Sequence, residues 1–355
     1  MSGTALSPAS EPQKVPDLWF ESDSLVIRAG DRLIRVSPSQ LGKRAKALGD
    51  ILSMPNSGLE SYEGCPVVEL QDDPVEVEAF LRTLFDPFLH GISAKPSARH
   101  TAGILRLSHK YDAPSLRQRT LQYLADSYPT TLSGFDAGAR EIRPSAEAAM
   151  IFDVATETQA LWLVPFAMLS WVHADAKQFT ADVPASDTLR LEFDTQTRHS
   201  AWSMREQYRV LWTRFIVLMF DADLCPEPVS MPANSIFAIY RPSQKTRGCA
   251  LSNGRCAAYL RKTCKQELTT PSYRCLAILE PNWLLGKTCD MCANCTMNFI
   301  ERHERLRQEF WGALPEIFGV SGWTELEVMK AKDLGAKAAV VEATVVTSAS
   351  VRNIF

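Results

Sequence analysis

The amino-acid sequence predicts a mixed α/β fold of the α+β type, with a small sheet flanked by helices and a mostly α-helical C-terminal domain after it. Short β-type runs separated by turn residues lie between positions 25 and 70, and an amphipathic helical pattern follows at 74–85. Beyond position 148 the chain is apolar with several large aromatic residues, as expected for packed helices. With 355 residues, 46% of them hydrophobic, there is material for two buried cores.

The sheet is predicted from three short runs. Leu25–Ala29 and Arg32–Val36 are β-type runs, and Gly30 and Asp31 between them are typical of a hairpin turn. Pro66–Leu70 provides a third run of the same kind. We therefore expect one hairpin and one further strand.

Two helix starts are marked by proline behind a capping residue. Ser37 as N-cap and Pro38 at the first helical position predict a helix, or a pair of helices, that runs to about Ser53. Asp73-Pro74-Val75-Glu76 predicts a second start, with Glu76 closing a capping box. Spacing of i, i+3, i+4, i+7 and i+8 then places five apolar side chains on one helix face: Val77, Phe80, Leu81, Leu84 and Phe85.

Two more helices are expected around 104–111 and 121–128, separated at Pro114 because proline disfavours helix in the residue before it.

The domain boundaries are predicted from the composition of the chain. Residues 1–16, rich in Ser and Pro, are predicted to be a disordered leader, and 17–130 the α/β domain. Residues 131–147 contain Gly and Pro and are predicted to be a linker. The mostly helical domain spans 148–330, and 331–355 is a tail rich in Ala, Val, Thr and Ser that fits no single element.

Several sequence pieces occur in the order and at the spacing of a known family. They are Asp23 before Leu25-Val-Ile27, Pro38-Ser-Gln-Leu41, Glu63-Gly-Cys-Pro-Val-Val68 before Asp72-Asp-Pro74, Leu105-Arg-Leu-Ser-His-Lys-Tyr111 and Tyr128-Pro129. Through these pieces the segment 23–128 resembles a BTB/POZ domain, in particular that of the BTB proteins of mushroom-forming fungi. Three later pieces resemble the helical region of the same proteins: Leu163-Val-Pro165, Trp311-Gly-Ala-Leu-Pro315 and Phe318-Gly-Val-Ser-Gly-Trp323.

The resemblance implies a non-catalytic BTB/POZ module that binds other proteins and pairs with a second copy of itself as a homodimer. Family pairing places Leu41, Arg44 and Leu48 on or near the self-association surface, with ordinary helix packing as the alternative for the same residues. Relatives usually carry His just before this helix, then Ser and an aromatic residue along it. This chain has Ser37, Ala45 and Leu48 there, a departure that bears on pairing by this route.

Two other functions stay open. Some relatives are substrate adaptors that bind a cullin-type ubiquitin ligase, although the sequence contains no substrate-recruiting repeat domain. Others are transcriptional regulators, although the sequence contains no DNA-binding fingers. Both alternatives are therefore weaker than a self-associating interaction module.

Composition and motifs argue against other classes. The net charge is −3 with a pI near 6.1, and scattered Lys and Arg form no nucleic-acid surface. The longest apolar run, Phe215–Phe220, is far shorter than the ~18 residues of a membrane span, and no secretory signal begins the chain. We expect an intracellular protein, cytoplasmic or nuclear. No phosphate loop, G-x-S-x-G or H-E-x-x-H motif occurs, and His109 lacks an identified partner, so we expect no enzyme activity.

The cysteines give the one candidate for a cofactor, a structural zinc ion. Eight of the nine lie between Cys225 and Cys295, and without a secretory signal they are expected to be reduced. Cys289, Cys292 and Cys295 stand three residues apart, and a fourth zinc ligand could come from Cys275, Cys264 or His303. The alternative is that these cysteines line the buried face of a helix, as small hydrophobic residues. Cys249, Cys256 and Cys264 are too loosely spaced to indicate a ligand set.

Overall fold

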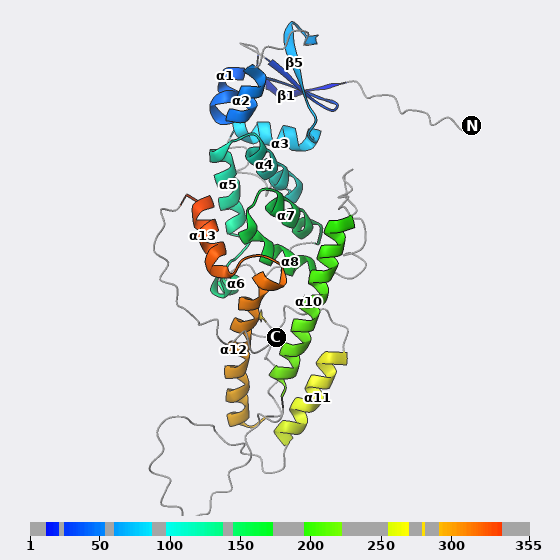
Figure 1. Cartoon of the computed structure of the whole chain (residues 1–355), viewed down its shortest axis with the longest axis vertical. Helices are drawn as coiled ribbons and strands as arrows, with labels where there is room; N and C mark the ends of the chain where they lie inside the picture. Colours follow the sequence, from blue (N-terminus) through cyan, green and yellow to red (C-terminus); the bar gives the residue numbers. More distant parts are fainter. Residues whose placement is uncertain are drawn as a thin grey trace, which may run out of the picture. The chain divides into compact units, whose positions relative to one another are not determined.

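The structure is a computed structural model of the whole chain, shown in Figure 1. It describes residues 12–20, 25–53, 60–86, 97–137, 145–172, 195–221, 255–269, 279–280 and 291–335. The chain forms two compact units. Unit 1 comprises Met1–Tyr128, Ala149–Val164 and Glu327–Val341, and unit 2 comprises Pro129–Ala148, Pro165–Leu326 and Glu342–Phe355. The described residues confirm the mixed α/β class, with a small sheet and mostly helices.

The sheet of unit 1 has five strands in the order β1-β3-β2-β5-β4. Their bounds are β1 Gln13–Trp19, β2 Leu25–Ala29, β3 Arg32–Val36, β4 Ser61–Tyr62 and β5 Cys65–Leu70. β2 and β3 form the predicted antiparallel hairpin, with Leu25 opposite Val36 and Ala29 opposite Arg32. Gly30 in its turn has φ +52°, a conformation that glycine adopts without strain. β5 pairs with β2 in parallel, so all three predicted strands are confirmed.

β1 differs from the sequence prediction. It begins at Gln13, inside the stretch 1–16 that was predicted to be a disordered leader, and it pairs in parallel with β3. Val15 and Leu18 on this strand are buried in the core of unit 1. The Ser- and Pro-rich leader therefore ends earlier than predicted, because the buried side chains of Val15 and Leu18 bring the strand onto the sheet edge.

In Figure 1, α1, α2 and α3 lie next to the sheet, and α4 and α5 lie on the other side of α3. Their bounds are α1 Pro38–Arg44, α2 Lys46–Ser53, α3 Pro74–Phe85, α4 Ala98–Lys110 and α5 Pro114–Ala125. Of the two alternatives for 37–53, the structure has the helix pair, since α1 ends at Arg44, Ala45 is its C-cap and α2 begins at Lys46. The predicted apolar face of α3 lies in the core with Val77, Phe80, Leu81 and Leu84 buried.

The two predicted caps differ. Asp73 accepts hydrogen bonds from the backbone N–H groups of Val75 (3.0 Å) and Glu76 (3.1 Å), which confirms the cap of α3. Ser37 stands at the N-cap position of α1, but its side chain makes no capping hydrogen bond. The Glu76 carboxylate, predicted to close a capping box, instead accepts from the Arg106 guanidinium of α4 at 2.5 Å. A charged partner on the next helix replaces the local backbone partner.

Two later helices carry residues of unit 1. The C-terminal part of α7 (Ser145–Glu157) and that of α13 (Trp323–Asp333) both belong to it. Asp333 accepts hydrogen bonds from Arg117 Nη1 of α5 at 2.7 Å and from Trp162 Nε1 at 3.0 Å. Residues 331–333, predicted to begin the tail, are therefore the helical end of α13 and contact the N-terminal part of the chain.

The described residues of unit 2 are helical, as predicted. Its helices are α6 Leu132–Ala137, α8 Val164–Val172, α10 Thr195–Met219, α11 Arg255–Thr269 and α12 Ala293–Ile317, with parts of α7 and α13. α6 and the start of α7 lie within 131–147, the predicted linker, because Phe135 is buried against Phe166 and Trp311. An aromatic core joins α10 to α12 through Phe310, which contacts Tyr208 and Phe215. Within the described ranges, no helix has both the length and the apolar character needed to cross a bilayer.

Candidate metal centre and docking surfaces

Three cysteine thiols from two helices meet in unit 2. Cys256 is the second residue of α11, Cys292 is the N-cap of α12, and Cys295 lies in the first turn of α12. Their three sulfur atoms lie within 4.8 Å of one another. Cys256 and Cys295 are buried and Cys292 is half-buried, with Met291 packed beside them. No disulfide joins these thiols. We call this group the thiol cluster.

A backbone hydrogen bond and a helix N-terminus lie at the thiol cluster. The backbone N–H of Cys292 donates to Cys256 Sγ at 3.3 Å. Cys292 stands at the N-cap position of a helix of 25 residues, and the N-terminus of a helix carries partial positive charge. Thiolates are the form of cysteine that binds metal ions. The position therefore suits metal-binding sulfur better than an apolar pocket would.

The dimensions fit a thiophilic metal ion. Zn–S bonds of about 2.3 Å place tetrahedral sulfur ligands about 3.8 Å apart, so the thiols need to move together by no more than about 1 Å. Among the described residues, the cluster has three sulfur donors and no carboxylate oxygen, as expected for zinc and other soft ions. The thiol cluster can hold a metal ion.

The cluster differs in membership from the predicted ligand set. Cys292 and Cys295 are in it, whereas Cys275 and Cys289 lie outside the described residues. Cys264 and His303 are described and do not join the cluster. Cys264 lies two turns after Cys256 on α11, half-exposed, and burial raises the pKa of its thiol. His303 lies eight residues beyond Cys295 on α12, about 12 Å along the helix axis, and is buried elsewhere in the unit.

Cys256 is the cluster residue that sequence reasoning missed. It stands 36 residues before Cys292, and its neighbours Cys249 and Cys264 show no ligand spacing. The alternative of a buried cysteine face on the second helix is confirmed for Cys295, since it is buried on α12 in register with Phe299, Leu306 and Phe310. The predicted zinc ligands and the predicted buried helix face concern the same place, because the buried face of α12 starts at the thiol cluster.

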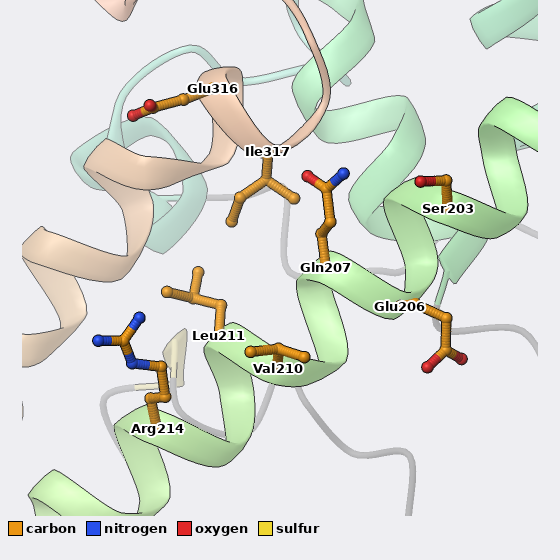
Figure 2. Close-up of a pocket in the computed structure, with 8 residues that line it drawn as sticks. All are labelled: Ser203, Glu206, Gln207, Val210, Leu211, Arg214, Glu316 and Ile317. Carbon is orange, nitrogen blue, oxygen red and sulfur yellow. The ribbon is translucent and has the colours of Figure 1, made fainter. Parts of the chain in front are cut away.

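A groove lies between α10 and α12 of unit 2, with a volume of about 610 Å³. Figure 2 shows its lining, with Val210, Leu211 and Ile317 at the apolar centre. Charged and polar side chains surround them: Ser203, Glu206, Gln207, Arg214 and Glu316. No cysteine or histidine is among the lining residues, so the groove is separate from the thiol cluster and offers apolar contact with a polar rim.

The residues predicted near a self-association surface divide into two kinds. Leu41 and Leu48 are fully buried in the core of unit 1, in line with the helix-packing alternative. Arg44 is exposed at the end of α1. Its guanidinium lies 5.4 Å from the centre of the Phe85 ring and donates to the Leu84 carbonyl at 2.7 Å. The pairing role of all three stays a prediction.

Arg44 is part of an exposed aromatic surface. Phe20, which is 39% exposed after β1, packs against Phe85 with ring centres 5.4 Å apart. Arg44 stacks over the same Phe85 ring. We call these three residues the aromatic–arginine patch. Such residues are enriched at protein interfaces because they bury large areas and can still hydrogen-bond.

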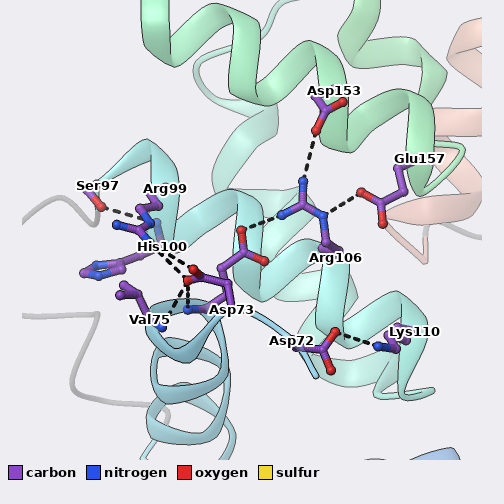
Figure 3. A network of polar contacts seen from close by, with 11 residues as sticks. Asp72, Asp73, Val75, Ser97, Arg99, His100, Arg106, Lys110, Asp153 and Glu157 are labelled. Carbon is purple, nitrogen blue, oxygen red and sulfur yellow. Dashed lines mark hydrogen bonds and ion pairs between the residues drawn. The ribbon is translucent and has the colours of Figure 1, made fainter. Parts of the chain in front are cut away.

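A network of ion pairs holds α3, α4 and α7 together inside unit 1 (Figure 3). Arg106 on α4 contacts Glu76 at 2.5 Å, Asp153 at 3.1 Å and Glu157 at 2.6 Å. Burial raises the pKa of the Glu76 carboxyl, although the Arg106 guanidinium acts in the opposite direction. Burial lowers the pKa of the Arg106 guanidinium, but the Glu76 and Glu157 carboxylates outweigh it and raise that pKa. Three acids on one base form a structural clamp across the three helices.

His109, set aside in the sequence as structural, is exposed in the last turn of α4. Its neighbours Lys110 and Tyr111 both reach Asp72, and Lys110 does so at 2.6 Å. Burial and the Asp72 carboxylate raise the pKa of Tyr111. These contacts join α4 to the end of β5.

Comparisons with protein-family models, with curated proteins and with solved structures find no match to this chain. The class that the fold defines is therefore a coarse one, a mixed α/β unit followed by helices. Function has to be inferred from the residues and the geometry of the chain itself.

Proposed function

We propose that residues 17–130 form a BTB/POZ-type interaction module without catalytic activity, which pairs with a second copy of itself inside the cell. The order of elements supports this proposal: a strand hairpin, a helix pair, a strand parallel to the first, and three further helices. Two of the sequence pieces behind the family resemblance fall on these helices in the same order, whereas Asp23 lies outside the described residues. Pro38-Ser-Gln-Leu41 opens α1, and Leu105–Tyr111 spans the end of α4.

The observation that carries the proposal is the aromatic–arginine patch. Phe20 and Arg44 are exposed, yet both are held in place by the Phe85 ring. Side chains that are already ordered lose little conformational entropy when a partner covers them. A guanidinium over an aromatic ring also tolerates desolvation, since the ring face attracts the cation. These properties are typical of residues that contribute most to binding energy.

The buried residues of the same helices set the geometry of this surface. Leu41 and Leu48 pack α1 and α2 against the core of unit 1. Substituting them would disturb the fold along with any interface, so they cannot test pairing. Arg44 and Phe20 can, because their side chains project outward.

The test is the mass of the full-length protein in solution, measured by light scattering and sedimentation velocity. We expect a dimer for the unsubstituted chain, and at least a tenfold weaker dimer for the double variant Phe20→Ser, Arg44→Glu. This corresponds to about 1.4 kcal/mol. Tyr123→Ser is the matched control, since Tyr123 is 41% exposed on α5 of the same unit. A monomeric unsubstituted chain, or a double variant as dimeric as the control, would contradict the proposal.

We also propose that a structural zinc ion binds in the C-terminal cysteine region, as the spacing of Cys289, Cys292 and Cys295 predicts. The meeting of three thiols in the thiol cluster supports it. Zinc would supply a crosslink between segments and no chemistry on a substrate. Metal analysis of the reduced full-length protein should show about one zinc per chain, and a protein without stoichiometric zinc would rule the ion out.

A further inference from the structure

We propose that Cys256, Cys292 and Cys295 together bind one thiophilic ion of the Zn²⁺ class, and that this ion attaches α11 to the first turn of α12. The inference rests on the proposed zinc ion. It goes beyond it by naming a ligand 36 residues from the closely spaced cysteines and by assigning the ion a structural consequence.

The first argument is the position of Cys256. Its side chain is fully buried, although a cysteine at the start of a surface helix does not have to be buried. It lies at the N-terminus of α12, where backbone N–H groups have no acceptor within the helix, and the Cys292 N–H donates to it at 3.3 Å. That hydrogen bond helps to hold the Cys256 sulfur close to the sulfur atoms of Cys292 and Cys295.

The second argument is how weakly α11 is otherwise anchored. Of its 15 residues, three are buried, namely Cys256, Leu260 and Thr263. α12, by comparison, buries twelve of 25 residues. A helix of this length is marginal in water without tertiary contacts. Apart from Cys256, Leu260 is the one apolar residue among these three buried residues. A metal–sulfur bond at the N-terminus of α11 would therefore add an attachment that the burial of apolar side chains does not provide.

The third argument is charge. Each thiol must lose its proton to bind the ion, and three thiolates within 4.8 Å would repel one another without a cation between them. A divalent ion bound by three thiolates leaves one negative charge, which the N-terminus of α12 is placed to offset. Binding forms three metal–sulfur bonds and releases up to three protons to solvent. Affinity for the ion must therefore fall as the pH falls.

The test uses the full-length reduced protein, stripped of metal and then titrated with Co²⁺ and with Zn²⁺. Co²⁺ bound by thiolates shows a charge-transfer absorption whose intensity rises with the number of sulfur ligands. Three variants are compared with the unsubstituted chain: Cys256→Ser, Cys256→His and Cys264→Ser. Cys264 is the matched control, because it lies on the same helix outside the thiol cluster.

We expect Cys264→Ser to bind one ion like the unsubstituted chain. Cys256→Ser should bind at least about tenfold more weakly, since even an outer-shell partner of a metal ligand contributes that much. Cys256→His should keep the ion through its imidazole with a weaker charge-transfer band, which separates loss of a ligand from loss of the fold. Hydrogen exchange should show that removing the ion speeds exchange in α11 while the centre of α12 stays protected.

The outcomes separate the two proposals. If the unsubstituted chain binds no metal, both the zinc ion and this inference fail. If it binds one ion and Cys256→Ser binds it with the same affinity and the same band intensity, the zinc ion stands and this inference is overturned. The ligands would then be the other cysteines, such as the predicted Cys275 and Cys289.

Discussion

At the scale of single residues, Arg106 shows how much of unit 1 depends on one side chain. It lies between α3, α4 and α7 and is the common partner of Glu76, Asp153 and Glu157. Glu76 is the most buried of the three acids, with 13% of its side chain exposed. A carboxylate in that position is stable only while a cation faces it.

Replacing Arg106 with methionine should lower the free energy of unfolding by about 2–3 kcal/mol, because it leaves the Glu76 carboxylate buried without its partner. Urea unfolding would measure this. The control is Arg209→Ala, which removes an exposed i,i+3 ion pair with Glu206 on α10 and should cost less than about 0.5 kcal/mol. Equal effects of the two substitutions would contradict the clamp.

The stability of the Arg106→Met variant should also depend on pH. Burial raises the pKa of Glu76 in the folded state, and without Arg106 nothing opposes that shift. An acid with a raised folded-state pKa stabilises the fold below its unfolded pKa of about 4.3 and loses that contribution as the pH rises through the folded-state value. The stability deficit of Arg106→Met should therefore shrink between pH 7 and pH 5. A deficit that grows on acidification would contradict the assignment.

At the scale of elements, α1 and α2 depend on two glycines that let their backbones approach. A Cβ atom on Gly49 would lie 2.4 Å from the Gly42 Cα, closer than atoms of packed helices can come. The close packing of α1 against α2, the first of which carries Arg44, therefore depends on the absence of side chains at this contact. Any side chain at the contact would push the helices apart.

Gly49→Ala should destabilise the protein by about 1–3 kcal/mol, because the added methyl group has no room. Gly312 on α12 is the matched control. A Cβ there meets nothing within 4 Å, so Gly312→Ala should stabilise the helix by up to about 1 kcal/mol. Thermal unfolding of both variants should shift in opposite directions, and a neutral Gly49→Ala would show that the helices separate easily.

Elements with local signals were predictable from the sequence, and those held by distant contacts were not. The turn at Gly30 and the cap at Asp73 are encoded within a few residues, and both are confirmed. β1 was missed because its partner β3 lies about 20 residues further along and its own composition is that of a leader. Cys256 was missed for the same reason, since no spacing rule connects it to the start of α12.

At the scale of the whole molecule, the compact units do not follow the continuous boundaries expected from the sequence. Unit 1 takes in residues 149–164 and 327–341 from the C-terminal part of the chain. Asp333 contacts Arg117, 216 residues away, and no sequence pattern announces such a pair. The segment 17–130 alone would lack two of its packing partners. Folding of the proposed interaction module is therefore linked to the C-terminal part of the same chain.

Asp333→Ala tests that link. The carboxylate is 15% exposed and accepts from both the half-buried Arg117 and the fully buried Trp162, so its loss removes the acceptor of both donors and should cost about 2–3 kcal/mol. Hydrogen exchange should speed up in α5 of unit 1, far away in sequence, while α12 of unit 2 is unchanged. Glu325→Gln, an exposed acid at the start of the same helix, should change neither. If Asp333→Ala leaves the hydrogen exchange of α5 unaltered, α13 does not stabilise α5, and the N-terminal module folds without it.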